Sequence, residues 1–278
     1  VNALQDINND VTGNHIIGSY VLGANIDASA TATWNGGKGF APISADGHFQ
    51  GVLDGLGHTI SDLTINRPTD DILGLFRNVS GSAVIRNLGL VGADITGQNY
   101  VGMLAGKNGA TIENVFAEGD VTGGDYVGGL IGTSVGSIVN SYTEGSIVSS
   151  GIYSGGIVSS NDGTLSGVYS TADIIGTEGT GGLVGINSGT IEDAFATGSV
   201  TGSININVGG LVGRNHGSIS NSFATGDVES SGSGVGGLVG QNNDGPITDS
   251  YATGTVSGDK DVGGLIGIAT GTSSISNV

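Results

Sequence analysis

The sequence of 278 residues contains no cysteine, three prolines and only seven lysine and arginine residues. Without cysteine, a disulfide framework and thiolate metal sites are excluded. So little proline excludes collagen and proline-rich linkers. Against 25 aspartate and glutamate residues, the few basic residues leave a formal net charge of −18. Because such a surface repels other polyanions, nucleic acids and anionic membranes are excluded as main partners.

Long hydrophobic runs are also missing. No apolar stretch approaches the ~18 residues that a membrane-spanning helix needs, and no basic leader opens the chain. We therefore expect no membrane insertion. We also expect either that a secretion signal has been removed or that the sequence is a segment of a longer polypeptide.

Glycine is abundant, at 56 of 278 residues against a usual share of about 7%. Valine, isoleucine, leucine and alanine are frequent enough to build a core, which argues against disorder. Serine, threonine, asparagine, aspartate and glycine separate short apolar runs. This pattern indicates many short strands that are joined by tight turns.

An internal repeat is most easily followed in the pattern V-G-G-L-V-G. Successive copies are 26 to 28 residues apart, which fits no heptad and no 33-residue helical repeat. Each copy is followed by G-x-I-x-N-S-Y/F-A-T-G and then by G-D-V-T-G, so that one repeat holds three β-like segments. The copies begin at Val101, Val127, Ser154, Thr180, Val208, Val235 and Val262, and a degenerate copy begins at Ile72.

Four positions of the repeat are apolar in nearly every copy. A single coil of three strands cannot bury its apolar face, so coils must stack with like residues about 4.8 Å apart. We therefore predict an all-β fold, a right-handed parallel β-helix (β-solenoid) with three strands per coil, about nine or ten coils and all four columns inside. The columns are Leu104, Leu130, Ile157, Leu183, Leu211, Leu238 and Leu265; Ile112, Ile138, Leu165, Ile191, Ile219, Ile247 and Ile275; Phe116, Tyr142, Tyr169, Phe195, Phe223 and Tyr251; and Val121, Ile147, Ile174, Val200, Val228 and Val256.

A polar column lies two residues before the aromatic one. It consists of Asn114, Asn140, Asp193, Asn221, Asp249 and Asn277. We predict that it forms a ladder at an inner corner, where side-chain amides satisfy backbone groups of the turn. The paired glycines of V-G-G-L-V-G are expected to permit a bulge or a close approach of the backbone.

These segments resemble a known family. The pattern V-G-G-L-V-G-x-N-x-G-x-I-x-N-S-Y/F-A-T-G-x-V is similar to the GLUG repeat of large bacterial exoproteins, and residues 49–65 resemble the opening coils found before such repeats. The resemblance covers roughly residues 46–278 and implies a secreted passenger of the filamentous-haemagglutinin or two-partner-secreted type. GLUG repeats also accompany a family of secreted metallopeptidases, so the repeat indicates an architecture more firmly than a function. The pattern is broken at residues 154–159 and at Gly167, where we expect a locally distorted coil.

As one continuous domain, the chain divides into irregular opening coils (residues 1–45), degenerate opening coils (46–97) and GLUG-type repeats (98–278). Residues 3–9 are predicted to form a short helix with Asn2 as its N-cap. The last repeat stops midway at Val278 without a polar cap. Because solenoids need caps, we expect the C-terminal end to be a cut boundary or to continue into further coils.

Motifs that are typical of enzymes occur only in unsuitable contexts. The sequence Gly132-Thr-Ser134-Val-Gly136 matches G-x-S-x-G, but it falls between predicted strands rather than in a strand–turn–helix. The four histidines are scattered and H-E-x-x-H is absent, so zinc peptidase chemistry is not expected. A polysaccharide lyase or hydrolase would need clustered carboxylates, whereas here they are spread along the repeats. We predict that the chain is not an enzyme and has no catalytic residues.

Two kinds of ligand site are candidates. Carboxylates at the turns of adjacent coils could supply the oxygen ligands that calcium prefers, although a solvated acidic face without a cofactor is the favoured interpretation. Trp34 and Phe40, in the non-repeating segment 31–42, could stack on sugar rings, although packing over the first coil is favoured. The calcium candidates are Asp120, Asp125, Asp227, Glu229, Asp259 and Asp261.

Two classes of function are left open. The leading prediction is a non-enzymatic shaft of a secreted or cell-surface bacterial adhesin, acting in adhesion or in a biofilm matrix. Its partners would be a polysaccharide, a host or neighbouring-cell surface, or another copy of itself, because a repeating surface suits multivalent contact. The alternative is a stalk or substrate-positioning module of a larger secreted enzyme, either a peptidase or a polysaccharide-degrading enzyme.

Overall fold

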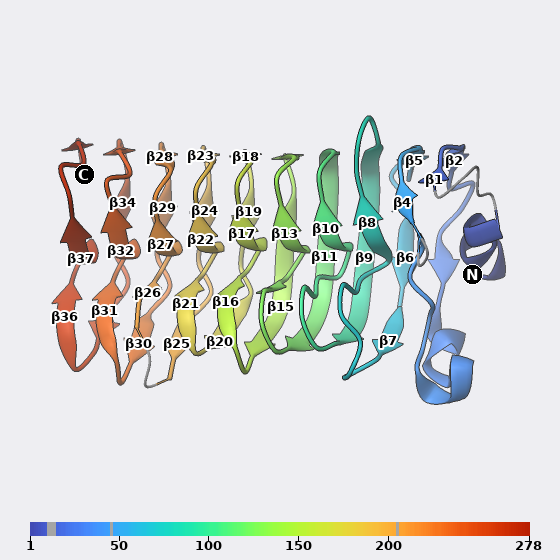
Figure 1. Cartoon of the computed structure of the whole chain (residues 1–278), viewed down its shortest axis with the longest axis horizontal. Helices are drawn as coiled ribbons and strands as arrows, with labels where there is room; N and C mark the ends of the chain where they lie inside the picture. Colours follow the sequence, from blue (N-terminus) through green and yellow to red (C-terminus); the bar gives the residue numbers. More distant parts are fainter. Residues whose placement is uncertain (10–14, 45–46, 204–205) are drawn as a thin grey trace.

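Short β-prone segments that return every 26 to 28 residues stack on one another along the chain (Figure 1). The computed structural model describes residues 1–9, 15–44, 47–203 and 206–278. One sheet, sheet A, takes one strand from each of ten levels. Its strands are β1 (His15–Ile16), β4 (His48–Phe49), β8 (Phe76–Val79), β10 (Ala105–Asn108), β13 (Ile131–Ser134), β17 (Val158–Asn161), β22 (Val184–Asn187), β27 (Val212–Asn215), β32 (Val239–Asn243) and β37 (Ile266–Thr270).

Two further sheets complete the coils. Sheet C has six strands, namely β12 (Val127–Gly128), β16 (Ile152–Gly155), β21 (Glu178–Gly181), β26 (Val208–Gly209), β31 (Ser233–Gly236) and β36 (Lys260–Gly263). Sheet B contains the other strands, namely β2 (Ser19–Val21), β3 (Ile26–Asp27), β5 (Val52–Asp54), β6 (Thr59–Ser61), β7 (Thr64–Asn66), β9 (Val84–Thr96), β11 (Thr111–Gly123), β14 (Ser137–Val139), β15 (Tyr142–Ser149), β18 (Thr164–Ser166), β19 (Tyr169–Ser170), β20 (Asp173–Gly176), β23 (Thr190–Glu192), β24 (Phe195–Ala196), β25 (Val200–Gly202), β28 (Ser218–Ser220), β29 (Phe223–Ala224), β30 (Val228–Ser230), β33 (Ile247–Thr248), β34 (Tyr251–Ala252), β35 (Val256–Ser257) and β38 (Ile275–Ser276).

The strands pair in parallel from one level to the next. Within the described residues, the one antiparallel contact is an isolated bridge between Gly39 and Ile65. Isolated parallel bridges from Leu73 to Val101 and from Val101 to Val127 extend sheet C by two levels. About eight turns are therefore complete on all three sides, and the predicted all-β parallel β-solenoid is confirmed.

The aliphatic columns lie in the core, as predicted, except at the last coil, where Ile275 is 38% exposed. Val121 pairs with Ile147, and Ile147 pairs with Ile174 at the next level. All three are at most 1% exposed. A parallel register without slips places each of these side chains between two like neighbours, and fully burying one of them contributes about 1.5–3 kcal/mol.

A buried polar ladder also runs through the core, and the sequence analysis missed it. Near the end of four successive strands of sheet A, an asparagine is 0% exposed, and the Nδ2 of each of the first three donates to Oδ1 of the next asparagine at 2.8 Å. The same Nδ2 atoms reach backbone carbonyls of the following turns. Because an unpaired amide in a core is costly, this ladder holds each turn in place. The four residues are Asn161, Asn187, Asn215 and Asn242.

The column that precedes the aromatic residues lies at an outer corner, which corrects our expectation of an inner one. All six residues are exposed, and their φ angles lie between 48° and 53°. Asparagine and aspartate tolerate this left-handed conformation better than most residues, so they turn the chain here. Gly167, with φ 63°, occupies the same corner.

The coil that departs from the repeat pattern stays in register, because Ser154 pairs with both Val127 and Thr180. The expected distortion is therefore wrong.

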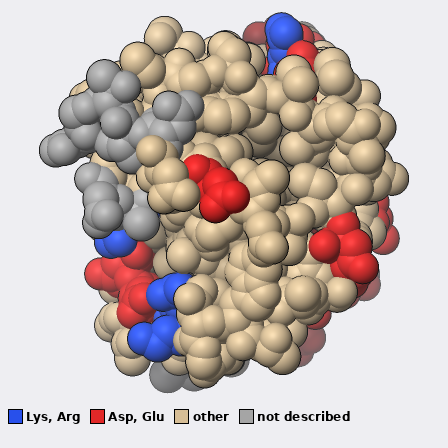
Figure 2. Space-filling view, turned by 90° about the vertical axis from the view of Figure 1, so that its right-hand side faces the viewer, with Lys and Arg blue, Asp and Glu red and all other residues tan. Residues whose placement is uncertain are grey.

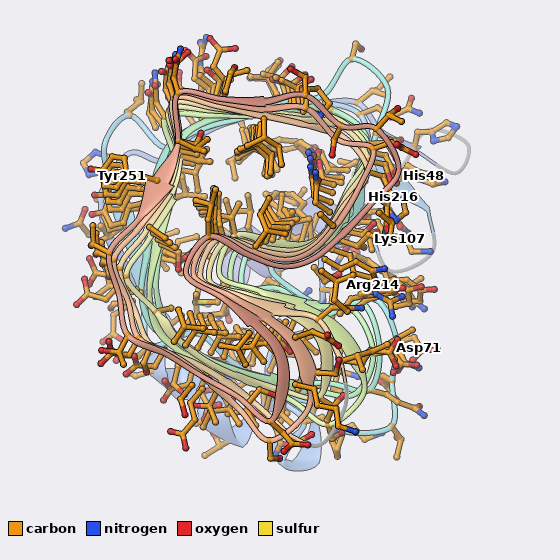
Figure 3. All side chains as sticks on the ribbon, turned by 90° about the vertical axis from the view of Figure 1, so that its left-hand side faces the viewer. His48, Asp71, Lys107, Arg214, His216 and Tyr251 are labelled. Atoms are coloured by element: carbon orange, nitrogen blue, oxygen red, sulfur yellow. The ribbon has the colours of Figure 1, made fainter. Side chains whose placement is uncertain are left out.

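The paired glycines bring different parts of the backbone into contact. A Cβ added to Gly182 would lie 2.1 Å from the carbonyl oxygen of Gly210 in the next coil. No side chain fits at that distance, so the predicted close approach of the backbone is confirmed. Viewed along the stack, the ribbon turns inward on one side and gives the cross-section two lobes (Figure 3).

The N-terminal segment is partly helical. The predicted helix is split into an α-helix, α1 (Asn2–Gln5), and a 3₁₀-helix, η1 (Asp6–Asn9). Its N-cap is Val1, with no capping bond from a side chain, so the prediction of an Asn2 cap is wrong. A kinked 3₁₀ segment, η2 (Ser29–Gly37), follows β3. Among the described residues, no helix is long and apolar enough to cross a membrane.

Candidate binding surface

The aromatic column has the predicted register but lies on the outside of the coil. Phe195 pairs with Tyr169 on one side and with Phe223 on the other. The residue that follows it, Ala196, is 1% exposed, so the ring points outward while the methyl group points into the core. Figure 3 shows Tyr251, the last ring of the column, on this outer side. The expectation of an internal aromatic stack is therefore wrong.

The rings of this column present their edges, rather than their faces, to the solvent. From Phe116 to Tyr251, consecutive ring centroids are 4.7–5.2 Å apart and the planes are within 2–8° of parallel. Each ring therefore covers the face of the next one. Burial raises the pKa of Tyr142 and Tyr169, so their hydroxyl groups stay protonated. The stacking stabilises the coils, and the ring faces from Tyr142 to Phe223 are covered on both sides, so sugar rings cannot stack on them.

Two further outward columns lie beside the rings. From Asp120 onward, carboxylates of the second column alternate with hydroxyl groups, so these charges are two coils, or about 9.6 Å, apart, whereas Asp94 lies directly opposite Asp120 in the preceding coil. Asp173 accepts hydrogen bonds from the N–H and the hydroxyl of Ser199, at 2.9 and 2.7 Å. This alternation limits repulsion between like charges. The first column is Glu118, Glu144, Thr171, Thr197, Thr225 and Thr253, and the second is Asp120, Ser146, Asp173, Ser199, Asp227 and Thr255.

The structure does not bring the six calcium candidates together. Asp120 and Asp227 belong to the alternating column, with three coils between them. Asp125 accepts the N–H of Ile152 at 2.8 Å, and Asp261 accepts the hydroxyl of Ser233 at 2.6 Å. The remaining two, Glu229 and Asp259, are exposed. In the part of the chain that is described, no three His, Cys, Asp or Glu side chains could hold a metal ion together.

The two aromatic candidates of the N-terminal segment differ in accessibility. Phe40 is 0% exposed, so its ring cannot meet a sugar from the solvent, and the alternative of packing applies to it. Trp34 is partly exposed and packs against the core, with its ring centroid 6.4 Å from that of Phe40. A role for Trp34 in binding stays a prediction.

The outer face of sheet A carries a column that the sequence analysis did not single out. This column, called the sheet A outer column below, contains two histidines, a lysine and an arginine but no carboxylate, although the chain has 25 carboxylates. Figure 3 shows His48, Lys107 and Arg214 on the same side of the stack. Most of its members occupy the variable third position of V-G-x-N. The sequence could reveal this column only after the repeats were aligned in register and these positions were compared. The members are His15, His48, Asn78, Lys107, Thr133, Ser160, Ile186, Arg214, Gln241 and Ile268.

Several other cations have a carboxylate partner. Arg86 Nε lies 2.8 Å from Asp54 Oδ2, and Arg67 Nη1 lies 3.4 Å from Asp70 Oδ2. Hydrogen bonds from the Asn87 side chain and the Leu56 N–H lower the pKa of Asp54, and Arg86 lowers it further. Figure 2, viewed from the N-terminal end, accordingly shows basic side chains next to acidic ones.

Three tyrosines form a row beside the sheet A outer column and contact two of its cations. Tyr100 and Tyr126 are stacked with centroids 4.8 Å apart, and Tyr153 follows at 5.5 Å. Lys107 Nζ lies 4.4 Å from the centroid of the Tyr100 ring. At the other end, Arg214 donates to the Tyr153 hydroxyl at 3.1 Å and to Glu178 at 2.7 Å. Lysine and tyrosine are thus held together by a cation–π contact.

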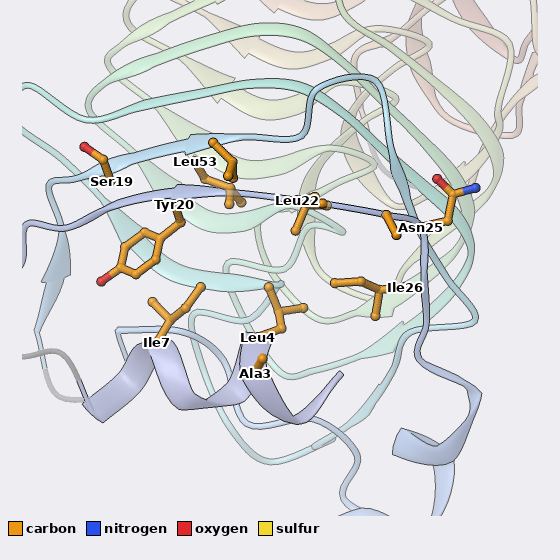
Figure 4. A pocket seen from close by; sticks show the side chains of 12 residues that line it. Ala3, Leu4, Ile7, Ser19, Tyr20, Leu22, Asn25, Ile26 and Leu53 are labelled. Atoms are coloured by element: carbon orange, nitrogen blue, oxygen red, sulfur yellow. The ribbon is translucent and has the colours of Figure 1, made fainter.

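Two hollows are relevant to binding. A pocket of ≈ 530 Å³ between α1 and the first strands of sheet B is mainly apolar, with Leu4, Leu22 and Ile26 in its walls (Figure 4). A smaller pocket of ≈ 210 Å³ lies along the sheet A outer column. It is lined by His48, Asn78, Val79, Ser80, Lys107, Asn108, Gly109, Thr133 and Val135.

Family models match two separate parts of the chain. Residues 2–119 match the M26 IgA1-specific metallo-endopeptidase N-terminal region. Residues 176–201, 204–229 and 231–257 match the GLUG motif. The expected GLUG repeats are thus confirmed, whereas the filamentous-haemagglutinin type stays a prediction.

The chain spans only a small part of the curated relatives that it matches. Halomucin of Haloquadratum walsbyi is 45% identical over 122 residues, which are 42% of this chain and 1% of halomucin. A protein assigned as a Gly-rich membrane protein in Evansella cellulosilytica is 37% identical over 87 residues, which are 30% of this chain and 10% of that protein. A crystal structure assigned as an immunoglobulin A1 protease from Bacteroides ovatus superposes with a TM-score of 0.57 at 16% identity, over 96% of this chain and 81% of that one. This last likeness concerns the fold, and the sequence matches identify a GLUG-repeat region.

Proposed function

We propose that this chain is a non-catalytic spacer and contact region of a larger surface or secreted protein. The observation that carries the proposal is the unbroken ten-strand ladder of sheet A, which presents repeating columns at successive levels. Catalysis needs perturbed acids and bases gathered in one cleft, whereas here the acidic groups recur along the stack. A rigid repeating surface instead suits spacing and multivalent binding, in which weak contacts add through effective concentration.

Within this proposal, an adhesive shaft is the first candidate. Its support is the similarity to halomucin and to a Gly-rich membrane protein, both of which are far longer than the matched segments. The partner would be a polysaccharide, a host or neighbouring-cell surface, or another copy of the chain. The protein would act outside the cell or on its surface, in adhesion or in a biofilm matrix.

A stalk beside a peptidase is the second candidate. It is favoured by the match of residues 2–119 to the N-terminal region of IgA1-specific metallo-endopeptidases. In that case the solenoid would hold an immunoglobulin substrate or set its distance from a catalytic domain. No metal-binding or catalytic residue of this chain would take part.

Binding and turnover assays of the purified chain test these candidates. We expect no hydrolysis of pectin, alginate, casein or IgA1, with or without calcium, and weak binding to one of these polymers or to cells. Small-angle scattering should give an elongated particle, since nine intervals of about 4.8 Å make a ladder about 43 Å long. Preferential binding to IgA1 would favour the stalk, and binding to polysaccharide or cells would favour the shaft. Turnover that disappears when one carboxylate is replaced would refute both.

A further inference from the structure

The sheet A outer column departs from the charge balance of the rest of the molecule. The chain has 25 acidic residues and seven lysine and arginine residues, yet the ten members of this column include two of the seven and none of the 25. His15 and His48 are adjacent members, with ring centroids 5.8 Å apart. An uninterrupted line without carboxylates on such an acidic surface is a place where an anionic ligand meets little repulsion.

Of the two full charges in this line, Lys107 is the one without a carboxylate partner in an ion pair, since it takes part in none of the three ion pairs found among the described residues. Its ammonium group is held over the Tyr100 ring, and that ring is fixed by stacking on Tyr126. A cation held in place without a carboxylate partner loses little freedom when it binds an anion. Arg214, in contrast, is already engaged by Glu178.

The pocket at Lys107 supplies further groups for a ligand. His48, Asn78 and Thr133 line it with Lys107, and no carboxylate does. Its volume of ≈ 210 Å³ is below the range of about 300–1,000 Å³ that is typical of sites for drug-sized molecules. An amide, a hydroxyl group and an imidazole around one ammonium group suit a small unit that carries hydroxyl groups and one negative charge.

The parallel register extends these contacts along a line. Asn78, Lys107, Thr133 and Ser160 occupy successive levels, so polar side chains follow one another at about 4.8 Å. A linear polymer of sugar residues can run along this line and make similar contacts at each level. From this placement we propose that the sheet A outer column, centred on Lys107, binds a linear polysaccharide that carries carboxylate or sulfate groups. The proposal rests on the contact function proposed above and names its site and ligand class.

The test measures affinity for three soluble polymers by calorimetry at low salt. Polygalacturonate and dextran sulfate carry the two kinds of anion, and uncharged dextran is the neutral control. We expect binding to at least one of the two anionic polymers, weakening as salt is added, and none to dextran. Lys107→Gln should weaken binding roughly tenfold, since a hydrogen bond to a charged group is lost, whereas Lys107→Arg should retain it. Lys260→Gln, on sheet C, removes the same charge elsewhere and should change affinity less than about twofold.

Each contrary result has a separate meaning. Equal losses for Lys107→Gln and Lys260→Gln, or binding to dextran as strong as to the anionic polymers, would overturn the proposed site. Binding to a polysaccharide that Lys107→Gln leaves unchanged would also overturn it, but the general contact function would stand. If none of the polymers binds while scattering still shows an elongated particle, the ligand class is wrong and the spacer role is unaffected. Analytical ultracentrifugation tests whether a second copy of the chain occupies this column instead. If the parent chain forms dimers and Lys107→Glu dissociates them, the ligand is the acidic face of another chain, and the polysaccharide proposal is overturned.

Discussion

Asn187 occupies the middle of the buried asparagine ladder, and replacing it by alanine tests how the core is held. Its Oδ1 accepts a hydrogen bond from Asn161 Nδ2, and its Nδ2 donates to Asn215 Oδ1, both at 2.8 Å. Its Nδ2 also lies 3.4 Å from the carbonyl oxygen of Gly189 in the following turn. All three asparagines are 0% exposed, so water cannot readily replace a lost partner.

The cost of Asn187→Ala follows from these contacts. The change leaves Asn215 Oδ1 without its donor and leaves Asn161 Nδ2 with only the long bonds to the carbonyls of Gly163 and Thr190, each at 3.4 Å. Each buried group that loses its partner costs about 1–3 kcal/mol, so we expect the free energy of unfolding to fall by about 2–6 kcal/mol. The cavity left by the amide adds to this loss rather than offsetting it.

The matched control is Asn221, an exposed asparagine at the outer corner with φ 48°. Asn221→Ala should cost only about 1–2 kcal/mol, the penalty for a left-handed alanine, and Asn221→Gly should be close to neutral. Urea unfolding should be followed by far-UV circular dichroism and by tyrosine fluorescence, because a long repeat array need not unfold in two states. If Asn187→Ala proves no more destabilising than Asn221→Ala, the ladder does not stabilise the core as argued.

Three other changes test separate features. Phe195→Ala removes a partly exposed ring from the outer stack, so we expect a loss of about 1–2 kcal/mol rather than the 3–5 kcal/mol of a fully buried ring, and less than about 0.5 kcal/mol for the neighbouring Thr197→Ala. Gly182→Ala should lower the unfolding midpoint strongly because its Cβ meets a backbone oxygen, whereas the equivalent Gly264→Ala should be tolerated because nothing lies within 4 Å of the new methyl group. The pKa of Asp54 is lowered on folding, so its contribution to stability is present above its ordinary pKa and is lost as the pH falls through the lowered value. The melting temperature of Asp54→Asn should therefore fall less than that of the parent between pH 5 and pH 3, and equal falls would contradict this.

The register between coils could be predicted from the sequence because equivalent positions of the repeat pair with one another. Leucine and isoleucine recur in the same place of each copy, and stacking like on like is the one arrangement that buries them all. The structure accordingly pairs Ile112 with Ile138 and Val200 with Val228. Sequence periodicity therefore predicts best those columns in which the same kind of residue recurs in every coil.

The sequence did not allow us to predict which columns face the core and which face the solvent. Successive residues of a strand point to opposite sides, so Phe195 and Ala196 cannot both face the core. Size and hydrophobicity favour the phenylalanine, yet Ala196 is buried and the ring stacks outside. The lobe that receives Ala196 is narrow, since a Cβ on Gly182 would already lie 2.9 Å from the Ala196 Cβ. Only a small side chain fits there, which is Thr143 or Ser170 in two earlier coils, and this constraint comes from the opposite side of the coil.

The two kinds of asparagine show the same limit for polar residues. Asn187 and Asn221 both recur with the repeat, but one is buried in a hydrogen-bonded ladder and the other is exposed in a left-handed corner. Both uses suit the short amide side chain, which bonds to nearby backbone and tolerates positive φ. Composition and spacing therefore identify a structural asparagine without telling which of the two roles it has.

The sheet A outer column is harder still to find from the sequence. The residues of a binding site on a solenoid come from different coils, so they are far apart along the chain. Lys107 is 29 residues from Asn78 and 26 from Thr133, yet all three line one pocket. The positions that vary between repeats are those that stacking leaves free, so they carry least information about the fold and most about the ligand. A change there, such as Lys107→Gln, should therefore alter binding while leaving the unfolding curve within about 0.5 kcal/mol of the parent. A large loss of stability would instead mean that the Lys107–Tyr100 contact holds the coil together.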